Sequence, residues 1–355
     1  MTRKEAISHR LHCQLLATPV AGSPAHVLKL MGPMQAQDIS YFPWAVGVRA
    51  QSATLSEVRA EINSGGIIRA HLLRGTVHAV AAEDYQWISA YTKLRTLRTM
   101  QSWRTYTDHG RTSKQLLHEV IDAIMSLLAG HKALSRQELT DELSQLGIAA
   151  DGGCLNHCLL HAEADGQLCT GVKDARTIIW MRTDERLGIT SRNFSGDAAL
   201  AQLTRLYFGS HSPATLHDYC WWSALPMSTC RKGVQLIASE LTQVMVGDQE
   251  MLCINSNQAS DHIIYPVHMI PPFDEYLIGY TDRTLALDKR HDAQVFPRPG
   301  IARPSIMNRG RIVGTWKGTT VTSADQLEVT PFYESISLNK RELKKAQQRY
   351  TAFNQ

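Results

Sequence analysis

The stretch LLHEVIDAIMSLLAG, residues 116–130, sets the pattern from which the rest of the chain can be interpreted. Its apolar residues recur at helical spacing, and the helix that they predict ends at Gly130. The sequence Ser135-Arg136-Gln137-Glu138 is a capping box, so a second helix is predicted to begin there. A third helix and two strands are expected at about 153–164, 167–172 and 177–181. Three short helices followed by a two-stranded hairpin are the plan of a winged helix.

The same order of elements recurs on either side of this segment. Downstream, three helices are predicted to begin near Leu200, Ser212 and Ser228, and a hairpin follows at 243–246 and 251–254. Upstream the pattern is looser. Helices are predicted at 4–17, 24–37 and 55–63, and the strands of a hairpin at 67–73 and 76–81. A long basic helix at about 83–103 follows the hairpin. After about residue 259, short strand-like pieces separated by prolines lead to a basic helix at about 339–352, and Asn308-Arg309-Gly310 is predicted to form a turn before a strand at 311–316.

These patterns predict an α+β fold of four domains. Three tandem winged-helix domains are followed by a small C-terminal β-rich domain, with boundaries at 1–110, 111–182, 183–258 and 259–355. The first domain includes the long basic helix, and the last one ends with the closing helix.

The composition is that of an ordinary globular protein, with 43% hydrophobic and 20% charged residues. No apolar run approaches the roughly 18 to 20 residues that span a bilayer. The amphipathic N-terminus lacks the apolar core of a secretion signal. Seven scattered cysteines, an odd number, indicate reduced thiols. We therefore expect a cytoplasmic, nucleoid-associated protein that does not bind a membrane.

Two stretches are more basic than the net charge of +4 suggests. Six Lys or Arg and one acid lie between Lys93 and Lys114. The stretch from Arg298 to Lys317 contains Arg303, Arg309 and Arg311 as well, and no acid. Such stretches are typical of a polyanion-binding face. The alternative is a solvated helix face or a salt-bridged surface.

The segment Met34-Gln35-Ala36-Gln37-Asp38 carries the candidate chemistry. Its two glutamines follow an apolar helix-like run, and alternate side chains beyond a helix end point the same way. A carboxamide has no titratable proton, so it cannot act as a base at neutral pH. Two amides can still hold a water and stabilise a positive centre. Asp38 is the nearest carboxylate, and it either contributes charge, accepts a proton or caps a turn.

Candidate DNA-binding residues lie in the first predicted hairpin and in the C-terminal part of the chain. Arg69, Arg74 and His78 place donors on a two-stranded ribbon that can enter a groove of DNA. The alternative is that Arg74 and His78 fix the turn. Asp274, Tyr276 and Arg283 are candidate channel residues. The competing role is an internal Asp–Arg pair that holds the C-terminal domain together. Three tryptophans, Trp221, Trp222 and Trp316, are expected in the core.

No metal or cofactor is expected. Cys154, His157, Cys158 and His161 lie at i, i+3, i+4 and i+7, a spacing too tight for structural zinc, which draws its ligands from two elements. Neither Gly-Gly pair resembles a phosphate-binding loop.

Several motifs in order resemble the winged-helix DNA glycosylase family of AlkX and AlkZ. They are Gln35-Ala36-Gln37-Asp38, Ile68-Arg69-Ala70-His71-Leu72-Leu73-Arg74-Gly75-Thr76-Val77-His78, His211-Ser212-Pro213-Ala214-Thr215, Trp221-Trp222-Ser223, Pro272-Phe273-Asp274-Glu275-Tyr276 and Gly314-Thr315-Trp316-Lys317. Ser212 stands where relatives often carry glycine. The resemblance covers nearly the whole chain.

The resemblance implies three tandem winged helices and a barrel-like C-terminal domain around a DNA-binding channel. It also implies that Gln35 and Gln37 hydrolyse the N-glycosidic bond of N7- or N3-alkylated purines, including bulky adducts or interstrand cross-links. The expected partner is double-stranded DNA with alkylated bases. A monomer is expected because the repeats are internal. The alternative is a non-enzymatic winged-helix protein, either a transcriptional regulator or a damage binder.

Overall fold

A computed structural model describes residues 1–101, 114–150, 152–174, 177–187, 192–254, 266–318, 327–333 and 338–355. The chain forms two compact units. One consists of Met1–Val58 and Leu200–Gln355, and the other is Arg59–Ala199. Half of the first predicted basic stretch, 102–113, lies outside the described residues.

The unit Arg59–Ala199 contains the segment with the clearest helical pattern. This segment forms the helices α7 at Lys114–Leu127, α8 at Arg136–Gln145 and α9 at Gly152–Ala164. The strands β5 at Leu168–Val172 and β6 at Ile178–Arg182 follow. Their buried apolar side chains, among them Cys154 and Cys158, form one core. The predicted capping box is confirmed, because the Glu138 N–H donates to the Ser135 hydroxyl at 3.3 Å and the Ser135 N–H to the Glu138 carboxylate at 2.6 Å.

The strands of this unit form an antiparallel sheet. The hairpin β2 and β3, Ile67–His71 and Val77–Ala81, is followed by the long helix α5, Ala82–Gln101. The strand order is β3-β2-β5-β6-β4, where β4 is Leu134–Ser135. Strand β2 pairs with β5 between Arg69 and Thr170. The two hairpins on either side of residue 110 therefore share one sheet, and the four-domain division stays a prediction.

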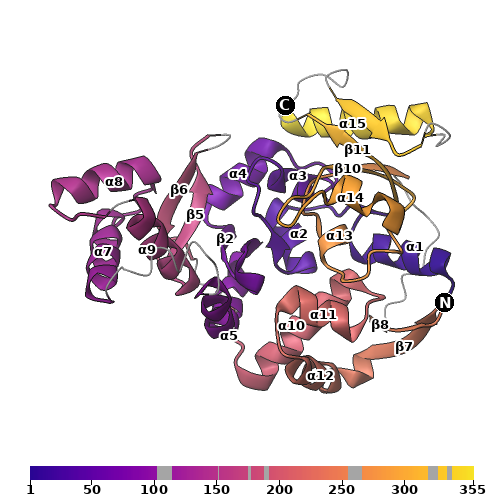
Figure 1. The fold of residues 1–355 in the computed structure, drawn as a ribbon, viewed down its shortest axis with the longest axis horizontal. Helices are drawn as coiled ribbons and strands as arrows, with labels where there is room; N and C mark the ends of the chain where they lie inside the picture. Colours follow the sequence, from indigo (N-terminus) through magenta and orange to yellow (C-terminus); the bar gives the residue numbers. More distant parts are fainter. Residues whose placement is uncertain are drawn as a thin grey trace. The chain divides into compact units, whose positions relative to one another are not determined.

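The other unit begins with four helices: α1 at Arg3–Cys13, α2 at Pro24–Met31, α3 at Phe42–Gly47 and the first turn of α4, Leu55–Ser64. The chain returns to it within α10, Gly196–His211, and continues through α11, Leu216–Ser223, and α12, Met227–Leu236. The hairpin β7 and β8, Leu241–Val246 and Gln249–Ile254, follows these helices (Figure 1). This helix–helix–helix–hairpin order agrees with the prediction.

The C-terminal part of this unit is an antiparallel sheet in the order β12-β11-β10-β9, covered by α15 (Figure 1). The strands are β9 at Val267–Ile270, β10 at Ser305–Asn308, β11 at Arg311–Lys317 and β12 at Glu328–Pro331. The helices are α13 at Glu275–Ile278, α14 at Asp292–Val295 and α15 at Lys340–Asn354. Among the described strands the sheet is open, with β12 and β9 at its edges. The predicted turn at Arg309-Gly310 is confirmed; both residues have positive φ, as a two-residue hairpin turn requires.

Aromatic residues fix α15 to the sheet. Trp316 and Trp44 each pack edge-on against Tyr350, with ring centroids 4.9 and 5.1 Å apart. The indole N–H of Trp44 donates to the Met269 carbonyl. Trp222 and Trp316 lie in the core as predicted. Trp221 does not, because 47% of its surface is exposed. Its indole N–H donates to the Ile278 carbonyl.

Two helices predicted in the N-terminal segment end earlier than expected. The helix predicted at 4–17 ends at Cys13. The helix predicted at 24–37 ends at Met31, since Gly32 adopts φ 73° and Pro33 follows it. A short extended strand, β1 at Met34–Gln35, takes the place of the last predicted turns. Helix α3 was not predicted. In the described parts of the chain, no helix is long and apolar enough to cross a membrane.

Candidate active site

The Gln-X-Gln segment lies directly after the end of α2. Met34–Gln35 form the short strand β1, and Gln37 lies at a bend two residues further on. Met34 and Ala36 are buried, at 1% and 0% exposure, whereas Gln35 is half-buried and Gln37 is exposed. Both glutamines are therefore more accessible than their neighbours Met34 and Ala36, and their convergence on one side stays a prediction.

A buried carboxylate holds the backbone of this segment. The N–H of Gln35 donates to Oε1 of Glu275 at 2.7 Å, and the indole N–H of Trp222 donates to Oε2 at 3.2 Å. Glu275 is only 1% exposed. Because the carboxylate accepts from two rigid donors, it fixes the position from which the Gln35 side chain leaves the backbone.

A histidine completes the environment of Glu275. Nε2 of His211 lies 3.4 Å from Glu275 Oε2, and Nδ1 lies 2.7 Å from the Ser210 hydroxyl. Burial lowers the pKa of His211, although the Glu275 carboxylate opposes this shift. The imidazole is therefore neutral at pH 7. A Cβ at Gly279 would lie 2.6 Å from Nε2, so only glycine leaves room for the ring.

The short helix that carries Glu275 is itself anchored. Asp274 caps α13 by accepting the Tyr276 N–H, and its two oxygens accept from both terminal nitrogens of Arg49 at 2.8 Å. Arg49 also donates to the Gln14 side chain at 2.9 Å. Both charged side chains are fully buried. Asp274 is thus part of a buried Asp–Arg pair, but its partner is Arg49 from the N-terminal part of the chain, whereas Arg283 donates to the Leu277 carbonyl.

Asp38 forms a turn. Its Oδ1 accepts the Ser40 N–H at 2.9 Å, and its carbonyl accepts the N–H of Phe42 at the start of α3. The turn role that the sequence allowed is therefore present. A catalytic role for Asp38 stays a prediction.

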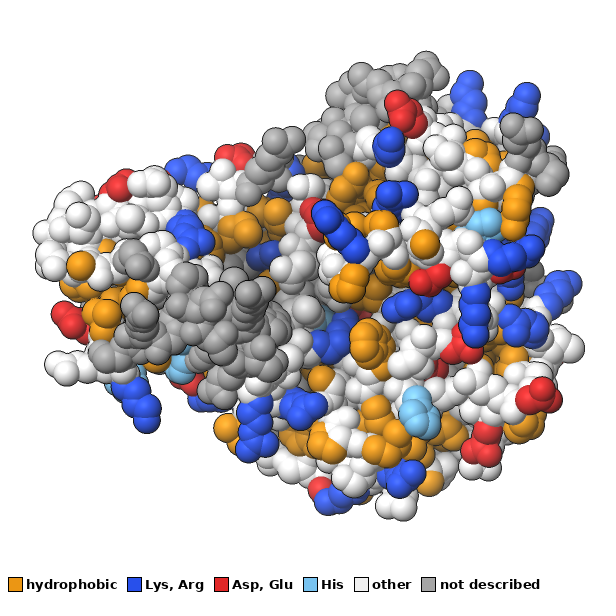
Figure 2. Space-filling view, viewed as in Figure 1, with side chains coloured by type: hydrophobic (Ala, Val, Ile, Leu, Met, Phe, Trp, Pro, Cys, Tyr) orange, Lys and Arg blue, Asp and Glu red, His pale blue; other side chains and the backbone are white. Residues whose placement is uncertain are grey.

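The four cationic candidates of the C-terminal part do not lie together. Arg309 lies in the turn before β11 and Lys317 is the last residue of that strand, which is about 20 Å long at 3.3 Å per residue; both side chains are exposed. Arg311 donates to the carbonyls of Thr284 and Leu285, and Arg283 donates to the Leu277 carbonyl. Burial lowers the pKa of Arg283. Lys and Arg side chains are nevertheless frequent on the surface of this part, with acids among them (Figure 2).

The three candidates on the first hairpin belong to the unit Arg59–Ala199. Arg69 is 2% exposed and donates to the Thr170 hydroxyl at 2.5 Å. Arg74, in the turn with φ 57°, approaches Nε2 of His78 at 3.5 Å, and Nδ1 of His78 lies 2.8 Å from the Thr76 carbonyl. These contacts agree with a turn-fixing role. DNA binding by the three residues stays a prediction.

Sequence reasoning missed Arg49, His211 and Glu275 as parts of the site. His211 and Glu275 stand in two of the motifs that carry the family resemblance, and this was the available signal. Arg49 lies in none of those motifs, and nothing in its local sequence distinguishes it.

Comparisons with known proteins agree with this fold. The model of the family described as DNA glycosylase AlkZ-like matches residues 28–353. An interstrand DNA cross-link repair glycosylase of Streptomyces sahachiroi is 22% identical over 360 residues, covering 96% of this chain and 94% of that protein. The solved structure of Streptomyces sahachiroi DNA glycosylase AlkZ superimposes with a TM-score of 0.79 at 20% identity, covering 100% of this chain and 97% of that one. The resemblance inferred from the sequence motifs is confirmed.

Proposed function

Because the chain belongs to the AlkZ-like family of DNA glycosylases, we propose that its Gln35-Ala36-Gln37 segment hydrolyses the N-glycosidic bond of alkylated purines in duplex DNA. The observation that supports the proposal is that Gln35 and Gln37 are more accessible than the buried Met34 and Ala36, and that Glu275 anchors the backbone N–H of Gln35. A purely DNA-binding regulator has no need for an accessible carboxamide on an anchored backbone.

The reaction suits residues without a proton to give. Alkylation at N7 or N3 places positive charge on the purine, so the base departs without protonation by an acid. The sugar then develops oxocarbenium character, as in glycoside hydrolysis. The enzyme's task is to stabilise this cation and to deliver water to C1′.

Both tasks fall to the carboxamide oxygens. An amide oxygen accepts a hydrogen bond from water and presents the negative end of its dipole to the developing cation. Holding the Gln35 backbone against Glu275 reduces the reorganisation that this stabilisation requires, and preorganised contacts of this kind contribute about 10² to 10³ in rate each. Neutral His211 adds no positive charge beside the forming cation.

We propose a lesion class that includes bulky and cross-linked purines. The Streptomyces relative bears the name of an interstrand cross-link repair glycosylase. A base tethered to the opposite strand cannot rotate fully out of the duplex, so the site must be open. The exposed position of Gln37 is consistent with an open site. Three winged helices and a C-terminal β-rich domain, acting as a monomer, remain part of the proposal.

Abasic-site formation tests the proposed reaction. The full chain is incubated with one duplex carrying a single N7-methylguanine, a second carrying a bulky N7 adduct and a third carrying an N7–N7 cross-link, and abasic sites are scored by alkaline cleavage. We expect cleavage of all three, and none of the undamaged duplex. Tight binding of the damaged duplexes without abasic sites would instead identify a damage binder.

A further inference from the structure

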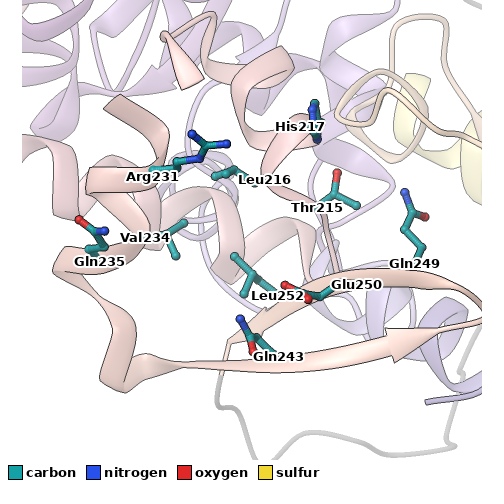
Figure 3. Close-up of a pocket in the computed structure, with 10 residues that line it drawn as sticks. All are labelled: Thr215, Leu216, His217, Arg231, Val234, Gln235, Gln243, Gln249, Glu250 and Leu252. Carbon is teal, nitrogen blue, oxygen red and sulfur yellow. The ribbon is translucent and has the colours of Figure 1, made fainter. Parts of the chain in front are cut away.

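A groove of about 460 Å³ lies between helices α11 and α12 and the hairpin β7–β8 (Figure 3). It shares no lining residue with the Gln35, His211 and Glu275 site. Its volume is within the range of small-ligand sites in proteins.

The hairpin wall of the groove is held in place from behind. Val246 and Met251 face away from the groove and pack with Ala6 of α1 and with Leu285. Gln243 and Leu252 are paired across the two strands and lie on the opposite face, as alternation along a strand requires. The groove is therefore preformed and does not depend on a ligand for its shape.

The interior of the groove combines apolar surface with side chains that have no protein partner. Leu216, Val234 and Leu252 give it an apolar lining from three elements (Figure 3). The hydroxyl of Thr215 accepts the N–H of Asp218 at 3.1 Å. The other polar side chains of the groove form no hydrogen bond or ion pair with any described residue; they include Arg231, Gln235, Gln243, Gln249 and Glu250. An apolar groove with a few charged and amide groups is typical of a site that binds a small ligand in one orientation.

The positions of the charged side chains restrict the class of ligand that fits the groove. Arg231 stands on helix α12 and Glu250 on strand β8, on opposite walls, and they do not pair with each other (Figure 3). A guanidinium binds phosphate through two parallel hydrogen bonds. A carboxylate accepts two adjacent N–H donors, which guanine presents at N1 and N2 and adenine does not. Glutamine amides donate to acceptors such as guanine O6 and N7.

We propose that this groove binds a guanine nucleotide. The flat base lies on Leu216, Val234 and Leu252, with its N1–H and N2–H groups donating to Glu250. The amide of Gln243 serves the acceptor edge, and the phosphate pairs with Arg231. The nucleotide is either free or an unpaired position of a DNA strand, since the recognised chemistry is the same.

Calorimetric titration of the full chain tests the site, with dGMP, dAMP and deoxyguanosine as ligands. We expect dGMP to bind about tenfold or more tightly than dAMP. Glu250→Gln should abolish this preference. Arg231→Gln should weaken dGMP about tenfold and leave deoxyguanosine unchanged, because only the phosphate contact is lost. Both side chains are exposed, so neither substitution disturbs the core. Arg341→Gln, an exposed cation on α15, is the matched control and should change nothing.

A DNA pentanucleotide with a central guanine flanked by two thymidines on each side distinguishes the free nucleotide from a strand position as the ligand. Binding of this strand about tenfold tighter than dGMP identifies a strand position, and equal or weaker binding identifies the free nucleotide. The proposal is overturned if neither probe binds saturably, or if binding is insensitive to both groove substitutions. Because these titrations involve no excision, a failure to bind would not contradict the proposed glycosylase activity. A failure to form abasic sites would likewise not contradict nucleotide binding in the groove.

Discussion

Glu275 accepts the backbone N–H of Gln35 at 2.7 Å although 240 residues separate the two in the chain. The C-terminal part of the protein thus holds the motif near its N-terminus. The same carboxylate contacts Trp222 and His211, so four segments meet at one buried group. The position of the candidate catalytic side chain therefore depends on residues that make no contact with substrate.

Replacing Glu275 should slow catalysis by misplacing Gln35. In Glu275→Gln, an NH₂ group faces either the Gln35 N–H or the Trp222 indole N–H, and one donor loses its acceptor. We expect single-turnover excision of N7-methylguanine to slow roughly 10- to 100-fold with duplex affinity unchanged. In a Gln35→Ala background the same substitution should cost less than about twofold, since the positioned group is gone. Equal losses in both backgrounds would show that Glu275 acts only on stability.

Gly279 should be intolerant of a side chain. Gly279→Ala places a methyl group 2.6 Å from His211 Nε2, which is below any real contact distance. We expect a loss of about 1 to 3 kcal/mol in urea unfolding. The matched control is Gly209→Ala within α10, where nothing lies within 4 Å, and it should be neutral or stabilising by up to about 1 kcal/mol. Indistinguishable stabilities for the two variants would contradict the packing around His211.

The buried pair of Arg49 and Asp274 should show strong coupling. Arg49→Met leaves a fully buried carboxylate without its cation, and we expect a loss of about 3 to 5 kcal/mol. Asp274→Asn leaves the guanidinium unpaired and should cost a similar amount. The double variant should lose clearly less than the sum of the two, because no unpaired charge remains. Additive losses measured by urea unfolding would contradict the pairing.

Stability should fall in mild acid because of His268. Burial lowers the pKa of His268 to about 3, whereas an unfolded histidine has a pKa near 6.5. Between these values the unfolded chain binds the additional proton, so stability is complete above about pH 6.5 and declines as the pH falls towards 3. We expect this residue to account for about 2 kcal/mol of the loss between pH 7 and pH 5. His268→Gln, which can still donate to the Leu16 carbonyl, should flatten the dependence; an unchanged pH profile would contradict it.

Local sequence signals predicted much of the fold. The capping box at Ser135, the turn at Arg309-Gly310 and the third helix–hairpin set are all present, because each depends on residues adjacent in sequence. The error at 24–37 was avoidable, since Gly32-Pro33 is itself a helix-ending signal. The open C-terminal sheet shows the limit of such reasoning, because spacing predicts strands but not whether they close into a barrel.

The site was predictable only in part. Gln35 and Gln37 could be singled out because their i, i+2 spacing predicts both side chains on one side. Glu275 could not, since a carboxylate in a four-residue helix carries no sign of the backbone amide that it accepts from far away in the chain. The cationic candidates illustrate a second limit. Charge runs predict basic surface, yet Arg69, Arg283 and Arg311 use their guanidinium groups to hold other parts of the protein.

The central claim is that the two carboxamides of Gln35 and Gln37 carry the excision of an alkylated purine. Its most direct test is the single-turnover rate of abasic-site formation on an N7-methylguanine duplex, measured for the wild-type chain, Gln35→Ala and Gln37→Ala alongside duplex affinity. We expect each substitution to lower the rate by about 10² to 10³ while affinity stays within about twofold. Wild-type rates in both variants would contradict the account.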